Sequence, residues 1–308
     1  MIRKKMIISV LAVVLCLGML LVGCGGNGNG ETPGGTAGEE PGENSGEPGE
    51  AAKETIKLGY VQWACAEAST HVAQAVIMDK LGYECTTTSL EVGGLYSGIA
   101  EGDLDAQTTA WLPITHKDYM EEFGDQMDDY GHIYNGARIG LVVPEYVDIN
   151  SIEELNDHVD DFSGRIVGID GGAGIMRATE QAIVDYGLEL ELLESSDMAM
   201  TAALADAYME EEWIVVTGWT PHWKFARFDL KFLDDSQGIY GGAEDIHVMA
   251  RQGLDEDAPD VANFLKNYYL EDYQLGAVIG AIADGAEPLQ AARDWIAENE
   301  DVVNGWLQ

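Results

Sequence analysis

The feature that most constrains the fold is a pair of similar segments, residues 108–116 (TTAWLPITH) and residues 216–223 (VTGWTPHW). Each is a short β-type run that reaches a tryptophan, with a proline two positions later. Because proline lacks the amide N–H that a sheet ladder needs, each strand should end there, with Trp111 or Trp219 at its carboxyl end. Ligands of open α/β sheets bind at the carboxyl ends of strands. A single tryptophan would more simply fill a core, but two in matching contexts favour a binding role.

The repeat extends through the segments that precede both tryptophans. Gly59 and Gly168 lie in two further strand-like runs, KLGYVQW and IVGIDGG, and each run opens into a helical segment. Gly59 precedes Trp111 by 52 positions, and Gly168 precedes Trp219 by 51. Both copies follow the order strand, helix, turn, strand, helix and tryptophan strand, which is typical of βαβ units on a parallel sheet. We therefore expect an α/β protein with two similar lobes whose strand ends face each other across a cleft.

The start of the chain predicts export. Residues 1–22 begin with three basic side chains and continue as an unbroken apolar run, the pattern of a secretion signal. The run ends in LVGC, which resembles the lipobox of bacterial lipoproteins and implies a signal peptide over residues 1–23 and a lipid on Cys24. An ordinary signal peptide and a retained helix are the alternatives. Because two acyl chains suffice for stable anchoring, we expect an exported protein held at the outer face of the cytoplasmic membrane, on the cell surface or in a periplasm.

Residues 24–53 are expected to form a disordered linker behind the anchor cysteine. They are rich in Gly, Glu, Pro and Asn and nearly devoid of large apolar side chains, so ordering them would bury too little surface to offset its entropic cost. The remaining residues, 54–308, are ample for a two-lobed body. No later apolar run is long enough to span a bilayer, so any channel would be a separate polypeptide.

The net charge limits the classes of binding partner, and the cysteine content limits the possible metal sites and disulfides. The formal net charge of −39 argues against nucleic acid or anionic lipid as a partner. Cys65 and Cys85 remain after the signal and the anchor, and their spacing fits no metal motif. They either form a disulfide, which an exported protein permits, or stay as two buried free thiols.

The chain is expected to cross from one lobe to the other twice, each time along a strand. The apolar run that ends at Pro144 is interpreted as a strand leaving the first lobe, and residues 246–250 as a second crossing. We therefore expect residues 54–143 and 248–308 to form lobe 1 and residues 144–247 to form lobe 2.

The sequence lacks the patterns of the common enzyme classes. There is no Gly-x-Ser-x-Gly, His-Glu-x-x-His, P-loop or dinucleotide fingerprint, and the six histidines have no ligand spacing. We expect no catalytic site, no metal and no cofactor. The cluster from Gly171 to Gly174 follows a predicted strand and opens a helix, so its free amides suit a small anion such as a carboxylate.

The remaining candidates indicate a ligand with two unlike ends. A quaternary ammonium cannot hydrogen-bond and is caged by aromatic faces, and the sequence supplies three tryptophans at predicted strand ends. The amides of Gly174 and Ile175, with a nearby donor such as His116, would hold a carboxylate. A cation at one end and a carboxylate at the other describe a betaine. The tryptophans are Trp63, Trp111 and Trp219.

These residues lie in motifs that resemble the glycine betaine-binding proteins of ABC transporters, and the resemblance runs from residue 57 to the C-terminus. The motifs are GYVQW (59–63), AWLPITH (110–116), IDGGAGIM (169–176) and VTGWTPHWKF (216–225). The resemblance implies a type II periplasmic-binding-protein fold, two lobes that close on the ligand about a hinge, and delivery to a permease driven by an ATPase subunit, both on separate chains, for osmoprotectant uptake.

The resemblance also implies roles for single residues. Trp63, Trp111 and Trp219 would form three walls of a cage around the ammonium group. His116 would donate to the carboxylate, as would the amides of Gly174 and Ile175. Two departures from the family pattern are the pair Gly171–Gly172, where relatives have Asp-Pro-Gly, and Cys65, where relatives tend to have a polar residue.

Other functions compete with this reading. Choline, carnitine or proline betaine would suit the same fold, and choline would make no use of His116 because it lacks a carboxylate. An amino-acid receptor would need an arginine on the carboxylate, such as Arg138, Arg165 or Arg177. An exported hydrolase would need a nucleophile with a base, which the sequence does not offer. A sensor that signals without transport would have the same sequence pattern.

Overall fold

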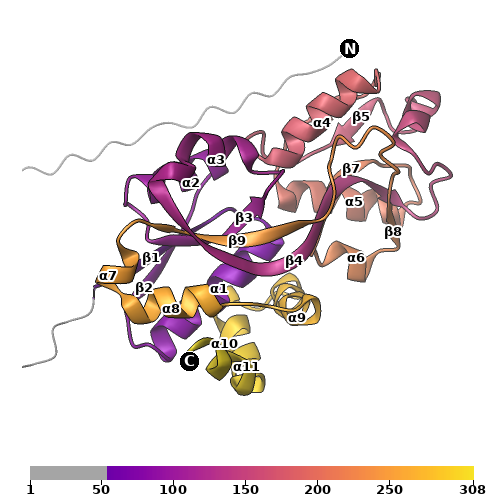
Figure 1. Cartoon of the computed structure of the whole chain (residues 1–308). Helices are drawn as coiled ribbons and strands as arrows, with labels where there is room; N and C mark the ends of the chain where they lie inside the picture. The colour runs from indigo at the N-terminus through magenta and orange to yellow at the C-terminus, as the bar shows by residue number, and fades with distance from the viewer. Residues whose placement is uncertain (1–53) are drawn as a thin grey trace, which may run out of the picture. The chain divides into compact units, whose positions relative to one another are not determined.

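The structure is a computed structural model, and it describes residues 54–308 (Figure 1). The expected signal peptide, the anchor Cys24 and the linker to residue 53 lie outside the described residues. No helix among residues 54–308 has the length and apolar character needed to cross a bilayer.

The first copy of the repeat forms a three-stranded parallel unit. Its strand β1 pairs in parallel with β2 on one side and with β3 on the other, and the seven residues of β3 are buried except for the last, which is partly buried. This unit is called the first lobe. In chain order its elements are β1 (Ile56–Tyr60), α1 (Ala64–Asp79), β2 (Cys85–Ser89), α2 (Val92–Ala100) and β3 (Ala106–Leu112).

The second copy repeats this arrangement. Its strand β5 pairs in parallel with β6 and with β7, so both copies have the order second strand, first strand, tryptophan strand. The predicted duplication of βαβ units is therefore confirmed in the topology. This unit is called the second lobe. Its elements are β5 (Arg165–Val167), α4 (Gly174–Asp185), β6 (Glu191–Leu193), α5 (Asp197–Met209) and β7 (Val216–Thr220).

Two long antiparallel strands connect the lobes, β4 (Met127–Pro144) and β9 (Glu244–Arg251). The first part of β4, to Ala137, pairs with β9, and the next part, from Arg138, pairs with β7. The sheet is thus continuous in the order β2-β1-β3-β9-β4-β7-β5-β6, with β8 (Leu230–Phe232) also on β4. Figure 1 shows both strands running from one lobe into the other. Both crossings were predicted as strands; the exact lobe bounds stay a prediction.

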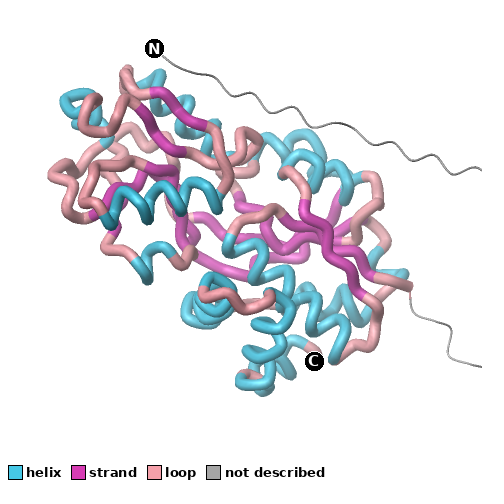
Figure 2. Tube along the Cα trace, turned by 180° about the vertical axis from the view of Figure 1, so that it is seen from behind, coloured by secondary structure: helices cyan, strands magenta, loops and turns pink. Residues whose placement is uncertain are grey.

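Helices at the C-terminus complete the first lobe, and Figure 2 shows them gathered beside its strands. Helix α1 packs against two of them, α9 and α10. The stacked rings of Trp295 and Trp306, 6.1 Å apart, lie in this core. The helices are α7 (Leu254–Asp257), α8 (Pro259–Asn267), α9 (Asp272–Ala283), α10 (Pro288–Glu298) and α11 (Glu300–Trp306).

Short helices fill the connections. One of them is a 3₁₀ helix that begins after Ser151, where Ser151 and Glu154 form a reciprocal capping box. The short helices are α3 (Lys117–Phe123), η1 (Gly124–Gln126), η2 (Ile152–His158) and α6 (Lys224–Arg227).

Cys65 and Cys85 are both buried free thiols. Burial raises the pKa of each thiol to about 12, so both stay protonated at neutral pH. Of the two alternatives left open by the sequence, the structure has the pair of buried thiols.

Candidate functional site

The two tryptophan strands end where the prolines require. Strand β3 ends at Leu112 and β7 at Thr220, each directly before a proline joined by a cis peptide bond. Trp111 and Trp219 are each 3% exposed. They therefore face the interior of the molecule at the ends of matching strands.

The six residues predicted to bind the ligand line one pocket. The first lobe and β4 contribute five of the lining residues, and the second lobe contributes the other five. Thr115, Ile139, Ile169 and Ala173 were not predicted, and their side chains are too ordinary in sequence to be singled out. The complete lining is Trp63, Trp111, Thr115, His116, Ile139, Ile169, Ala173, Gly174, Ile175 and Trp219.

One side of the pocket is aromatic and offers no negative charge of its own. The ring of Trp63 lies 6.5 Å from the ring of Trp219 and 5.9 Å from that of His116, centroid to centroid. The indole N–H of Trp111 is buried without a hydrogen-bond partner among the described residues. Indole faces attract cations, and they suit cations that have no N–H to donate.

His116 is held as a neutral hydrogen-bond donor. Its Nδ1 accepts the backbone N–H of Trp111 at 3.2 Å, so in the neutral ring the proton is on Nε2. Burial, helped by the charge of Arg177, lowers the pKa of His116 to about 3. The Nε2 atom is buried and has no partner among residues 54–308. This N–H is therefore available to an acceptor in the pocket, such as a carboxylate.

A second source of donors is the start of α4. Gly174 and Ile175 open this helix, with Ala173 as the N-cap, and the first amides of a helix lack intrahelical acceptors. The positive end of the helix dipole adds to their attraction for an anion. A Cβ on Gly174 would stand 2.2 Å from the backbone oxygen of Thr115, so only glycine permits this close approach of α4 to the first lobe.

Contacts between the lobes surround the pocket. Trp63 Nε1 donates to Asp170 Oδ2 at 2.9 Å, and the Tyr119 hydroxyl donates to the backbone oxygen of Gly172 at 2.8 Å. The Arg177 guanidinium pairs with Asp118 at 3.0 Å. The lobes are therefore in contact with each other on the pocket's rim.

The pocket is narrow in this closed arrangement. Its volume of about 20 Å³ is room for about one water molecule. A trimethylammonium group is larger, so its entry requires the lining rings to move apart. Separation of the lobes would provide that movement, because the lining comes from both.

Two carboxylates, the half-buried Asp170 and the buried Glu244, support the site and were not predicted in these roles. Asp170 accepts from the indole of Trp63, as described above. Glu244 at the start of β9 is 2% exposed and accepts the backbone N–H groups of Ile114 and Thr115 at 2.7 and 2.8 Å. It fixes the loop that carries His116. Neither pairing leaves a local signal, since the partners are far apart in the chain.

The chain matches a known family over most of its length. The profile of the family described as the substrate-binding domain of ABC-type glycine betaine transport systems matches residues 54–298. The glycine betaine/carnitine transport binding protein GbuC of Listeria monocytogenes is 48% identical over 144 residues, which are 46% of this chain and 48% of that protein. The chain thus aligns with about half the length of this relative.

Solved structures share the fold. Lactococcal OpuAC, in its closed-liganded conformation complexed with glycine betaine, matches with a TM-score of 0.79 and 34% identity over 83% of this chain and 100% of that chain. An ABC-transporter choline-binding protein in complex with choline matches with a TM-score of 0.76 and 27% identity, over 82% of this chain and 91% of that chain. The two-lobed fold predicted from the sequence is confirmed by these matches.

Proposed function

The chain belongs to the family of substrate-binding domains of ABC-type glycine betaine transport systems, and on this premise we propose that it binds glycine betaine in the pocket lined by Trp63, Trp111 and Trp219. The family consists of transport receptors rather than enzymes. The proposed ligand carries a permanent cation and a carboxylate, and the pocket has a suitable surface for each.

The observation that carries the proposal is the neutral donor at His116. Its Nε2–H is buried without a partner in the part of the chain that the structure describes, and it lies on the same pocket as the first two residues of α4. Three donors that converge without an acceptor favour a ligand with an anionic oxygen. The indole faces on the other side of the pocket offer no hydrogen-bond acceptors. An ammonium with N–H groups would need such acceptors, so the indole faces favour a methylated cation.

The expected energies suffice for a receptor. Three aromatic walls contribute ~0.5–2 kcal/mol each, and charge-assisted hydrogen bonds to the carboxylate contribute ~1.5–3 kcal/mol each. Micromolar affinity requires ~8 kcal/mol. Summed over three walls and three donors, these contributions span about 6 to 15 kcal/mol before the cost of immobilising the ligand, so the required value lies within their range.

We propose the same division into two lobes, and the same export across the cytoplasmic membrane, that the sequence predicts. Residues 54–143 with 248–308 and residues 144–247 would separate to admit the ligand and close on it. The signal peptide and the lipid on Cys24 would keep the protein at the outer face of the cytoplasmic membrane. There it would deliver the ligand to a permease and its ATPase subunit on separate chains.

Calorimetric titration with glycine betaine, choline and free proline tests the ligand class. We expect glycine betaine to bind, choline to bind more weakly because it lacks the carboxylate, and proline to compete poorly. Tighter binding of choline than of glycine betaine would favour the receptor for choline. Tighter binding of proline would favour an amino-acid receptor.

Replacement of Trp111 by alanine tests the cage. It removes one aromatic wall, so we expect the dissociation constant for glycine betaine to rise at least tenfold in the same titration. Trp213→Ala is the matched control, because Trp213 packs with tilted rings against His158 and Phe162 in the second lobe and is not part of the pocket lining. Equal affinities of Trp111→Ala and wild type would remove Trp111 from the site.

A further inference from the structure

Helix α1 begins beside the pocket without a cap of its own. Its N-cap residue is the pocket tryptophan Trp63, whose side chain makes no capping hydrogen bond. An indole has no acceptor oxygen to offer the first amides of a helix. The first residue of the helix, Ala64, therefore needs an acceptor from elsewhere.

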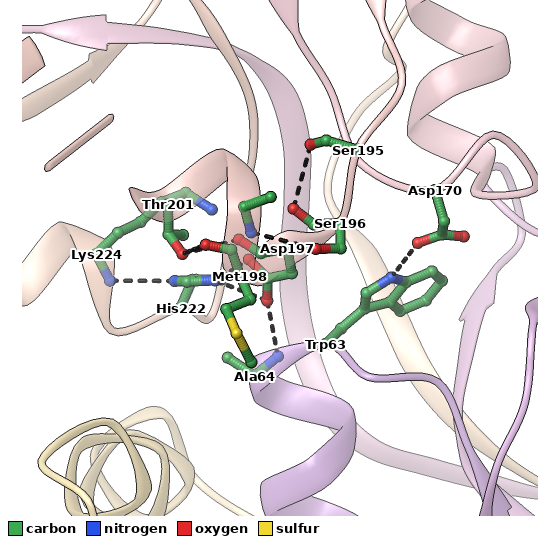
Figure 3. A network of polar contacts seen from close by, with 11 residues as sticks. Trp63, Ala64, Asp170, Ser195, Ser196, Asp197, Met198, Thr201, His222 and Lys224 are labelled. Carbon is green, nitrogen blue, oxygen red and sulfur yellow. Dashed lines mark hydrogen bonds and ion pairs between the residues drawn. The ribbon is translucent and has the colours of Figure 1, made fainter. Parts of the chain in front are cut away.

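That acceptor comes from the other lobe. Asp197 is the first residue of α5, and its Oδ2 accepts the backbone N–H of Ala64 at 3.1 Å. The carboxylate is only 6% exposed. Figure 3 shows Asp197 between Ala64 and the second-lobe residues around it.

The second lobe holds this carboxylate in an ionised state. His222 donates from Nε2 to Asp197 Oδ1 at 3.0 Å. Its Nδ1 accepts the backbone N–H of Lys224 at 3.1 Å, which fixes the proton on Nε2. Burial alone would raise the pKa of Asp197, but His222, Lys224 and the Ala64 amide lower it below its usual value. An anion at a helix N-terminus is also favoured by the helix dipole.

We infer that Asp197 is a positioning residue that caps α1 across the lobes and so couples lobe closure to the setting of Trp63. The contact exists only while the lobes are together, since its two partners belong to different lobes. Ala64 follows Trp63 directly, so the cap fixes the backbone that carries this wall of the pocket. Trp63 is held from the second lobe a second time through Asp170. Ligand affinity then includes the contribution of the cap, although Asp197 does not line the pocket.

The substitution Ala64→Pro tests the inference at the receiving end. Proline is well tolerated at the first position of a helix, and the extended backbone of Trp63, with φ −107° and ψ 144°, suits a residue that precedes proline. The change removes the N–H that Asp197 accepts and directs a ring carbon toward the carboxylate. This inference rests on the proposed function for its ligand. We expect the dissociation constant of the full-length protein for glycine betaine to rise about tenfold, with no loss of thermal stability in the ligand-free protein.

Two further variants separate a cap across the lobes from a general loss of stability. Asp197→Asn keeps the shape but removes the charge, and we expect affinity to fall about three- to tenfold. Glu287→Ala is the matched control, because Glu287 caps α10 within the first lobe, accepting from Gln290 N at 2.9 Å. It should lower the melting temperature and leave affinity within twofold of wild type. Wild-type affinity in both Ala64→Pro and Asp197→Asn overturns the inference.

The test also distinguishes failure of this inference from failure of the proposed function. Absence of glycine betaine binding by the wild-type protein counts against the proposed function alone. Hydrogen exchange at the Ala64 amide then decides the inference, measured at a saturating concentration of whichever ligand of the titration panel the protein does bind, so that the lobes are together. Asp197→Ala should accelerate this exchange and Glu287→Ala should not, and equal rates in all three proteins would refute the cap.

Discussion

At the scale of the residue, Lys224 is the side chain least matched to its surroundings. It is fully buried, and its Nζ has no hydrogen-bond partner among the described residues. It lies 3.9 Å from the centre of the Trp219 ring. Burial lowers the pKa of Lys224 to about 8, although Asp197 and Cys65 act to raise it. The charged amine is therefore tolerated at neutral pH at a cost in folding free energy.

Because the pKa of Lys224 is lower in the folded chain than in the unfolded one, its contribution to the free energy of unfolding depends on pH. Below pH 8 the lysine is protonated in both the folded and the unfolded chain, and the folded state carries the full penalty. Between pH 8 and its ordinary pKa of 10.5, the folded amine is neutral while the unfolded one still binds its proton. This group's contribution to stability therefore rises with pH over that interval. The shift corresponds to a penalty of about 3 kcal/mol, against which the cation–π contact returns ~1–2 kcal/mol.

Replacement of Lys224 by methionine should therefore stabilise the protein at neutral pH. Methionine keeps the length of the side chain and removes the buried charge, so we expect the free energy of unfolding to increase by ~1–2 kcal/mol at pH 7. The advantage should shrink at pH 10, where the wild-type amine is largely neutral in the folded state. Urea unfolding of both proteins at the two pH values measures this. A variant that is less stable than wild type at pH 7 would show that the amine makes a net favourable contribution.

At the scale of the element, the parts that were predictable from the sequence are those with a local cause. Pro113 and Pro221 end their strands because they lack an amide, and this alone locates Trp111 and Trp219. The nearly equal spacing of the two copies then predicts that both have the same order of strands and helices along the chain. The acceptors that hold the site could not be predicted, because Asp170, Asp197 and Glu244 meet their partners across the lobes or from distant strands. The six predicted site residues lie in the local motifs. Asp170 lies in one of them as well, but its partner Trp63 is 107 positions away, and Asp197 and Glu244 lie in none of the motifs.

The start of α4 gives a prediction about an element. Gly174→Ala would bring a Cβ against the backbone of Thr115, which cannot yield as a flexible side chain does. We expect α4 to move away from the first lobe and the dissociation constant for glycine betaine to rise at least tenfold. Gly276→Ala in α9 is the control, because a Cβ there meets nothing within 4 Å. It should add ~0.5–1 kcal/mol to stability through helix propensity and leave affinity unchanged. Similar affinities of the two variants would contradict the close packing of α4.

At the scale of the whole molecule, the net charge affects the stability of the fold, whereas the pocket that would bind the ligand is lined by uncharged side chains. The full chain carries a formal net charge of −39, and like charges repel more in the folded chain than in the expanded one. Salt screens this repulsion, with a Debye length that falls from about 10 Å at 0.1 M to 3 Å at 1 M. The melting temperature should therefore rise with salt. The pocket residues themselves carry no ionised side chain, since His116 is neutral.

The same field should discriminate between ligands by their net charge. Glycine betaine is a zwitterion, so the negative potential of the protein acts oppositely on its two ends and nearly cancels. Choline is a monocation, and its binding includes an attraction that salt removes. Between 0.05 and 1 M NaCl we expect the dissociation constant for glycine betaine to change less than about twofold, and that for choline to rise several-fold. Calorimetric titrations at the two salt concentrations measure both. If glycine betaine lost affinity with salt as choline does, its cation would be held by acidic side chains of the protein rather than by the indoles, and its carboxylate would be left outside the pocket.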